Sequence, residues 1–240
     1  MTRGLTKAAI VAAALDALDE TGLDGLTVRV VAGRLGVQPP ALYWHFGGKQ
    51  DLIDEMATEI WRQVTAELKA LPAGIGWDEA MTAFAGITRQ ALLSRRDGAR
   101  MVSGTYLTDA GLLREQEAGL ASMLAQGFTV ATATQAYQLL YSFIIGFCIE
   151  EQAVSQAAAA GDGRYSLASR AERVGAAAHP LVAQAGPEIF GDRDRRYADL
   201  VGVIVDAAGR MRDPGAASRA DRKADGPGGP ERKVPSAPAQ

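Results

Sequence analysis

The residues with the clearest potential for chemistry lie in one short stretch of the chain, 27–49. Two helical patterns of about eight residues, 27–34 and 38–45, are joined there by Leu35-Gly36-Val37, which is the spacing of a helix-turn-helix. In that motif the N-terminal residues of the second helix read base edges in the major groove of DNA. The side chains left facing outward on the second helix are Gln38, Pro39, Ala41, Tyr43 and Trp44, with His45 at its end. We therefore predict a DNA-binding surface, with a plain three-helix packing unit as the alternative.

The distribution of charge favours DNA binding only in the segment that holds the two helical patterns. No carboxylate lies between Asp24 and Asp51, so the presented surface would not repel phosphate. The whole chain carries a formal net charge of −3, whereas a non-specific nucleic-acid binder would carry a strong positive field. Any DNA contact should therefore depend on a few placed side chains.

Local signals fix the ends of the helices that position this surface. Thr6 and Thr27 are suited to N-caps, and the first helix is expected to end at Thr21-Gly22. Gly36 can take the positive φ that the tight turn demands. The Pro39-Pro40 pair suits the first turn of a helix because proline lacks an N–H that would be unpaired there. The apolar side chains expected to pack these helices together are Val31, Leu35, Val37 and Leu42.

The remainder of the chain is also predicted to be helical. Apolar residues recur at three- and four-residue spacing, and no long period-2 alternation appears, so the predicted fold class is all-α. Helices are expected over 49–71, 78–94, 97–106, 109–126, 130–160 and 188–211. The segment 161–186 is expected to be a partly ordered loop or a short helix, and 213–240 a disordered tail because it holds almost no large apolar residue.

Composition argues against several other classes of protein. The single cysteine, Cys148, excludes an intramolecular disulfide and cysteine-rich zinc modules, which fits a reducing cytoplasm. Neither His45 nor His179 belongs to a metal-ligand spacing, and no nucleophile elbow or phosphate-binding glycine loop occurs. We therefore expect no enzyme activity, no metal and no cofactor.

Two apolar stretches could suggest a membrane. Residues 139–149 are the most apolar, but they are shorter than the ~20 residues that span a bilayer. They should lie inside a helix bundle or against another subunit. The N-terminal stretch is interrupted at helical spacing by Asp16, Asp19 and Glu20, so an ordinary first helix is expected rather than a signal peptide. The expected location is the cytoplasm, without membrane contact.

The segment GLDGLTVRVVAGRLGVQPPALYWHFGGKQDLID closely resembles the DNA-binding domain of the tetracycline-repressor (TetR) family. The resemblance rests on the G-L-x-x-L-T-x-R opening, on LYWHF, and on Lys49 followed by Leu52-Ile53-Asp54. ALLSRRDGARMVSGTY, LAQGF and IIGFCIEEQ also resemble the ligand-binding half of the tetracycline-repressor branch. The resemblance covers residues 4–155 and extends weakly to Met211. It implies a helix-turn-helix domain over 1–48, a linking helix over 49–71 and an effector-binding and dimerisation domain over 72–212, before the tail at 213–240.

The resemblance also assigns DNA contacts. Arg29 matches a position that contacts guanine, and Tyr43, His45 and Lys49 match positions that contact phosphates or bases. Trp44 matches a residue that buttresses them; core packing is the alternative role for Tyr43 and the favoured one for Trp44.

Three departures from the pattern predict a different operator. Val28 and Ala41 stand where the tetracycline repressors have threonines, and Pro39 stands where they have a base-reading glutamine. More of the readout should therefore come from apolar contact and DNA shape.

The implied effector pocket departs further from the pattern of the tetracycline repressors. Glu67, Phe84 and Val102 occupy the positions of the drug-binding and metal-ligating residues, so tetracycline is an unlikely effector. Glu150 matches a carboxylate that the family places near the metal from the other subunit, but a solvated or capping role is the favoured interpretation. The remaining pocket residues would be Thr88, Met101, Thr105, Tyr106, Tyr137 and Tyr141, unless these residues simply fill a core.

The expected function is a ligand-responsive repressor that binds a palindromic operator as a homodimer. The helices around 139–149 and 188–211 would form the dimer's four-helix bundle, and the helix 49–71 would transmit a population shift caused by a largely apolar or aromatic effector. The segment RRDGARMVSGTYL is the expected element of rearrangement. Control by a protein partner, or action as an activator without a small-molecule inducer, is the alternative.

Overall fold

The computed structural model describes residues 5–213, and this part of the chain is helical throughout, without a strand. The predicted tail at 213–240 lies outside the described residues apart from Asp213. The helices are α1 (Lys7–Gly25), α2 (Val28–Arg34), α3 (Pro40–Tyr43), α4 (Lys49–Lys69), α5 (Trp77–Leu93), α6 (Gly98–Val102), α7 (Ala110–Ala125), α8 (Val130–Ala159), α9 (Leu167–Val174), α10 (Pro180–Phe190) and α11 (Arg193–Gly209). The all-α prediction is confirmed.

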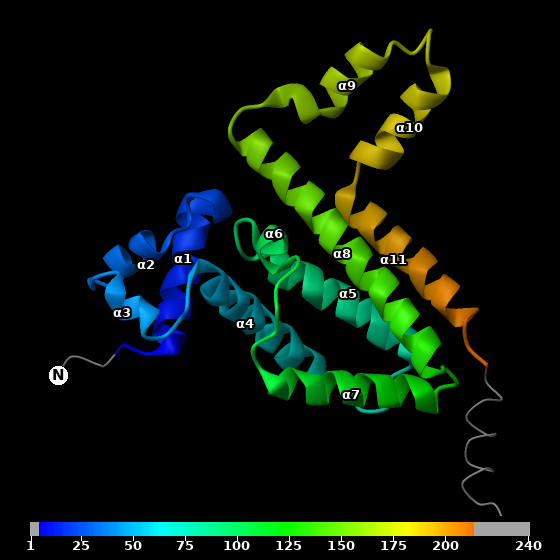
Figure 1. Cartoon of the computed structure of the whole chain (residues 1–240). Helices are drawn as coiled ribbons and strands as arrows, with labels where there is room; N and C mark the ends of the chain where they lie inside the picture. The colour runs from blue at the N-terminus through cyan, green and yellow to red at the C-terminus, as the bar shows by residue number, and fades with distance from the viewer. Residues whose placement is uncertain (1–4, 214–240) are drawn as a thin grey trace, which may run out of the picture.

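The first three helices form a small unit at one end of the molecule (Figure 1). Their predicted caps are confirmed, because the hydroxyl of Thr6 accepts from the N–H of Ala9 and that of Thr27 from the N–H of Val30, both at 3.2 Å. Gly36 has φ +66° in the turn after α2. The first helix loses its helical backbone at Gly22, as predicted, where φ is +70°, and a further turn assigned to α1 continues to Gly25.

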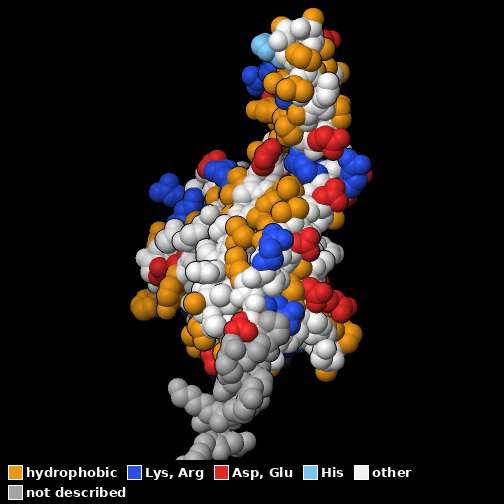
Figure 2. Space-filling view, turned by 90° about the vertical axis from the view of Figure 1, so that its right-hand side faces the viewer, with side chains coloured by type: hydrophobic (Ala, Val, Ile, Leu, Met, Phe, Trp, Pro, Cys, Tyr) orange, Lys and Arg blue, Asp and Glu red, His pale blue; other side chains and the backbone are white. Residues whose placement is uncertain are grey.

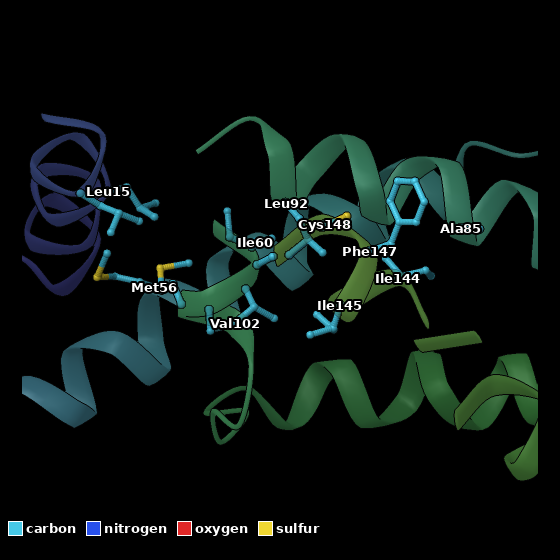
Figure 3. Close-up of a cluster of buried hydrophobic side chains, with 14 of the residues drawn as sticks. Leu15, Met56, Ile60, Ala85, Leu92, Val102, Ile144, Ile145, Phe147 and Cys148 are labelled. Carbon is cyan, nitrogen blue, oxygen red and sulfur yellow. The ribbon is translucent and has the colours of Figure 1, made fainter. Parts of the chain in front are cut away.

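The larger domain consists of α5 to α11, and α4 runs from the small unit into it (Figure 1). One hydrophobic cluster joins the two parts. It extends from Leu15 of α1 through Met56 and Ile60 of α4 to Leu92 of α5 and Ile144 of α8 (Figure 3). Because this cluster is continuous, a shift of α4 would change side-chain packing both in the small unit and in the larger domain.

Helices α8 and α11 lie side by side, and α9 and α10 project beyond the rest of the molecule (Figure 1). The prediction of a loop or a short helix over 161–186 is confirmed only in part, since the segment holds the short helix α9 and also most of α10. The predicted start of the last helix at 188 is also wrong. Residues 188–190 end α10, and α11 begins after Asp192, whose carboxylate accepts from the N–H of Arg195 at 3.0 Å.

No helix between residues 5 and 213 combines the length and hydropathy needed to cross a membrane.

Candidate nucleic-acid interface and ligand cavity

The helix-turn-helix exposes its recognition side chains by burying one residue of α3. Leu42 is buried against the core that contains Val31 of α2, which fixes the orientation of α3. Tyr43 is then 55% exposed and Trp44 89% exposed. Core packing, the alternative role for Tyr43 and the favoured one for Trp44, is therefore wrong. Gln38 is exposed as well, whereas Pro39, Ala41 and His45 are half-buried.

Two cations flank this surface. Arg29 of α2 is exposed and has no hydrogen bond or ion pair with any residue between 5 and 213, unlike Arg34, which is paired with Glu20 at 2.6 Å. Lys49 at the start of α4 is exposed, and its Nζ donates to the carbonyl oxygen of Leu23 at 3.4 Å. The guanidinium of Arg29 is therefore free to contact an external acceptor.

A cavity of about 730 Å³ lies in the larger domain, between α4, α5, α7, α8 and the segment that follows α6. Four rings line part of it, and we call them the aromatic wall: Trp61, Phe84, Tyr137 and Tyr141. The ring centre of Trp61 lies 6.3 Å from that of Phe84, with an angle of 12° between the ring planes. It lies 6.0 Å from the ring centre of Tyr141. Phe84 meets Tyr137 edge to face at 5.6 Å. The size falls within the range of ligand pockets, about 300–1,000 Å³.

Five of the predicted pocket residues line this cavity: Phe84, Val102, Thr105, Tyr137 and Tyr141. Four do not, and they need correction. Glu67 is exposed on α4, and Tyr106 is 75% exposed because the chain turns at Gly104 (φ +74°) after α6 has ended at Val102. Thr88 and Met101 are fully buried in the core instead.

From the sequence, only Glu67 of the helix 49–71 was assigned to the pocket, and the residues of α4 that line the cavity were missed. Trp61, Thr65 and Leu68 face it at a spacing of four and three residues. Glu67 lies on another face of the same helix and is exposed.

The charges of the cavity lining are balanced. Lys69 of α4 and Glu115 of α7 are the only charged residues that line it, and they pair at 2.7 Å. Burial raises the pKa of the phenols of Tyr137 and Tyr141, which keeps their protons in place at neutral pH. Neither phenol hydrogen-bonds to any residue of the described part of the chain.

The segment around α6 joins the cavity to α1. Val102 of α6 lines the cavity, and Asp97, just before α6, accepts a hydrogen bond from the N–H of Leu23 at 2.9 Å. Nη1 of Arg95 bonds the Asp19 carboxylate at 2.7 Å, and Nη2 of Arg100 bonds that of Asp24 at 3.2 Å. We call the contacts made by Arg95, Asp97 and Arg100 the α6 latch.

Helices α8 and α11 leave apolar side chains uncovered. Leu139 of α8 and Leu200 and Val203 of α11 are exposed, Val203 to 61%. Figure 2 shows hydrophobic side chains distributed along this face of the molecule, between charged ones. Exposed apolar side chains on two neighbouring helices make this face a candidate interaction surface.

Comparisons with known proteins agree with this geometry. Residues 10–56 match the family described as "Bacterial regulatory proteins, tetR family", and residues 71–206 match "Tetracyclin repressor-like, C-terminal domain". The chain is 35% identical to the tetracycline repressor protein class A from transposon 1721 of Escherichia coli over 204 residues, which cover 85% of this chain and 90% of that protein. A possible TetR family regulator from Streptomyces coelicolor A3(2) superposes with a TM-score of 0.75 at 32% identity, covering 86% of this chain and 100% of that one. A TetR variant from Acinetobacter baumannii AYE in complex with minocycline has a TM-score of 0.68 at 30% identity, covering 87% of this chain and 99% of that one.

Proposed function

Because this chain belongs to the tetracycline-repressor (TetR) family of DNA-binding transcriptional regulators, we propose that it represses from a palindromic operator as a homodimer and releases DNA when a small molecule fills its cavity. The observation that carries this proposal is the α6 latch. Through these contacts one short segment does two things: it lines the 730 Å³ cavity at Val102, and it hydrogen-bonds to the last turn of α1 at Asp97.

Direct readout would begin with Arg29. Its guanidinium is exposed and unpaired within the described residues, and bidentate pairing with guanine is worth about 1–3 kcal/mol of base discrimination. Tyr43, Trp44, His45 and Lys49 would hold the phosphate backbone, with Gln38, Pro39 and Ala41 facing the bases. With Val28, Pro39 and Ala41 in place of polar side chains, the operator should differ from the tetracycline operator.

The apolar side chains on α8 and α11 support a homodimer. A two-fold axis along this face would bring Leu139, Leu200 and Val203 against their copies in a four-helix bundle. Two recognition helices would then face half-sites about 34–36 Å apart, one helical turn of DNA. On this basis residues 1–48 form the DNA-binding domain, 49–71 the linking helix, and 72–212 the effector-binding and dimerisation domain.

Tetracycline bound through magnesium does not suit this cavity, although relatives are named as tetracycline repressors. Mg²⁺ takes carboxylate and other oxygen ligands. Here the only carboxylate in the lining is Glu115, already paired with Lys69, and neither histidine of the chain lines the cavity. Glu150 does not line the cavity of its own chain, and the family resemblance would place it at the cavity of the other subunit.

Release of DNA would follow from differential affinity. A ligand that contacts Val102 and Thr105 and prefers a shifted α6 would pull on the latch and reorient α1, and with it the recognition helix.

Footprinting of the purified protein on the DNA that flanks its own gene, at stated salt, tests the proposal. A symmetric footprint is expected for the native chain, and its position relative to the promoter separates repressor from activator. Arg29→Ala and Tyr43→Ala should abolish it, while Arg114→Ala on α7 and Tyr165→Ala near α9 should not, since both exposed residues lie away from α3. Retained footprints with the first pair would contradict this docking.

Oligomeric state and induction need their own tests. Val203→Asp should give monomers in sedimentation experiments and weaken operator binding. A panel of aromatic compounds should contain one that both raises the melting temperature and releases DNA. If none does, control lies with a protein partner.

A further inference from the structure

The lining of the cavity specifies the charge and shape of its ligand more closely than family membership does. We propose that the cavity takes an uncharged, metal-free, flat aromatic molecule whose ring carbonyl oxygens accept hydrogen bonds from Tyr137 and Tyr141. This inference rests on the proposed function only in taking the cavity as the effector site.

The shape follows from the aromatic wall. Its four rings come from α4, α5 and α8, and two of their contacts, the stacked pair Trp61 and Phe84 and the edge-to-face pair Phe84 and Tyr137, are arrangements that aromatic pairs prefer. Aliphatic side chains such as Val64, Leu112 and Leu120 line the cavity as well. A flat, rigid ring system can contact both kinds of surface with little loss of conformational entropy.

The absence of net charge follows from the pairing of Lys69 with Glu115. Among residues 5–213 these are the only charged residues that line the cavity, and they pair at 2.7 Å, with side chains that are 59% and 34% exposed. A charged ligand in the aromatic part of the cavity would lose its hydration without meeting an unpaired opposite charge, and burying an unpaired charge is costly. An uncharged ligand avoids this cost.

The ligand should carry carbonyl acceptors because two phenols in the cavity have protons to donate. Tyr137 and Tyr141 keep their protons because burial raises their pKa, and within residues 5–213 no acceptor takes those protons. The hydroxyl of Thr105, in contrast, already donates to the carbonyl oxygen of Val102 at 2.7 Å. The cavity therefore offers two hydrogen-bond donors on one helix, α8, one turn apart.

Metal chelation is disfavoured by the same lining. In the part of the chain that the structure describes, the lining offers a cation no unpaired carboxylate and no histidine, since its carboxylate, Glu115, is paired with Lys69. Magnesium should therefore have no effect on binding.

Matched anthraquinone derivatives test this inference by calorimetry on the full chain. The hydroxymethyl and carboxylate derivatives, substituted at the same ring position, differ mainly in charge. The hydroxymethyl compound should bind at least about tenfold more tightly. Tyr137→Phe and Tyr141→Phe should each weaken it about fivefold, as expected for one lost hydrogen bond. Tyr165→Phe, which changes an exposed tyrosine outside the cavity, is the matched control.

Any other outcome would contradict either the inferred ligand class or the proposed function. Tighter binding of the carboxylate, a requirement for magnesium, or no binding of either compound would overturn the inferred ligand class. A hydroxymethyl compound that binds but leaves the operator complex intact would instead contradict the proposed function and leave the ligand class standing.

Discussion

The carboxylate of Asp97 accepts a hydrogen bond from the backbone N–H of Leu23 at 2.9 Å, and this contact ties the segment before α6 to the last turn of α1. The other oxygen of Asp97 accepts from Nε2 of Gln156 on α8 at 3.0 Å. Asp97 itself lies in the left-handed region, with φ +55°, and Gly22 beside Leu23 has φ +70°. One buried side chain therefore connects three helices across the boundary between the two halves of the molecule.

Asp97→Asn should weaken this connection without adding backbone strain, because asparagine tolerates the left-handed region well. Its amide has one acceptor oxygen where two donors, from Leu23 and Gln156, now converge. We expect a loss of about 1–3 kcal/mol in the free energy of unfolding, measured with urea. Gln156→Glu on its own would add a repelling carboxylate and serves as a second probe. Unchanged stability in both variants would contradict the latch.

The same contact predicts a dependence on pH. Burial alone would raise the pKa of Asp97, but hydrogen bonds from Leu23 and Gln156 and the charges of Arg100 and Arg96 outweigh it and lower the pKa below its ordinary 3.8. A lowered carboxyl pKa gives stability that is fully present above 3.8 and is lost as the pH falls through the folded-state value. The stability difference between the native chain and Asp97→Asn should therefore be constant from neutral pH down to about 5 and shrink below 3.8. A difference that grows in acid would contradict this assignment.

The helix-turn-helix could be predicted from the sequence because its signals are local. Thr6, Thr27 and Gly36 each act on neighbours within a few residues, so the motif does not depend on the rest of the fold. Helices α9 and α10 were predicted only as a loop or one short helix. Apolar residues recur at helical spacing on α9, at Leu167, Ala171 and Val174, but the two helices bury no residue except Gly186.

The cavity was predicted only in part because it depends on packing between distant segments. Phe84 and Thr88 stand one turn apart on α5, yet the first lines the cavity and the second is in the core. The contact between Asp97 and Leu23 joins residues 74 positions apart, and no sequence periodicity indicates it.

Thr88→Val should stabilise the protein. The side chain of Thr88 is fully buried, and its hydroxyl has no hydrogen-bond partner among the described residues. Valine keeps the shape and removes the unpaired polar group, so we expect a gain of about 1 kcal/mol, or about 2–4 °C in melting temperature.

Thr58→Val is the matched control for Thr88→Val. Thr58 is equally buried, but its hydroxyl donates to the carbonyl oxygen of Asp54 at 2.8 Å and accepts from the N–H of Thr108 at 3.0 Å. Its replacement should cost about 1–3 kcal/mol because a buried donor loses its partner. Equal losses for the two valine variants would show that Thr88 has a partner after all.

Trp44→Ala should separate stability from DNA binding. Because Trp44 is 89% exposed, its truncation should change the free energy of unfolding by less than about 0.5 kcal/mol. Leu42→Ala, two residues earlier and buried, should cost about 2–5 kcal/mol. In fluorescence anisotropy with operator DNA, Trp44→Ala should weaken binding by about fivefold or more. Native affinity in this variant would remove Trp44 from the DNA interface.

Arg89 holds α5, α8 and α11 together through an ion pair that should be costly to break from one side. Its Nε and Nη2 donate to the carboxylate of Glu151 at 3.0 and 2.9 Å, and Nη2 also donates to Asp194 at 2.6 Å. The guanidinium lies 4.7 Å from the ring centre of Tyr197. The side chains of Arg89 and Glu151 are 15% and 11% exposed, whereas that of Asp194 is 85% exposed.

Removal of one buried charge leaves the other without its partner, so Glu151→Gln should cost about 3–5 kcal/mol in urea unfolding at fixed protomer concentration. Asp194→Asn removes an exposed partner of the same arginine and should cost less than about 1 kcal/mol. The double variant Arg89→Met with Glu151→Met should be more stable than Glu151→Gln, because it leaves no unpaired charge to desolvate. If Glu151→Gln costs no more than Asp194→Asn, water must reach Arg89 in solution. The three helices must then be held together by the rings of Phe143 and Phe147 against Tyr197, and by the hydrogen bond from the Tyr197 hydroxyl to the carbonyl oxygen of Ala85 at 2.8 Å.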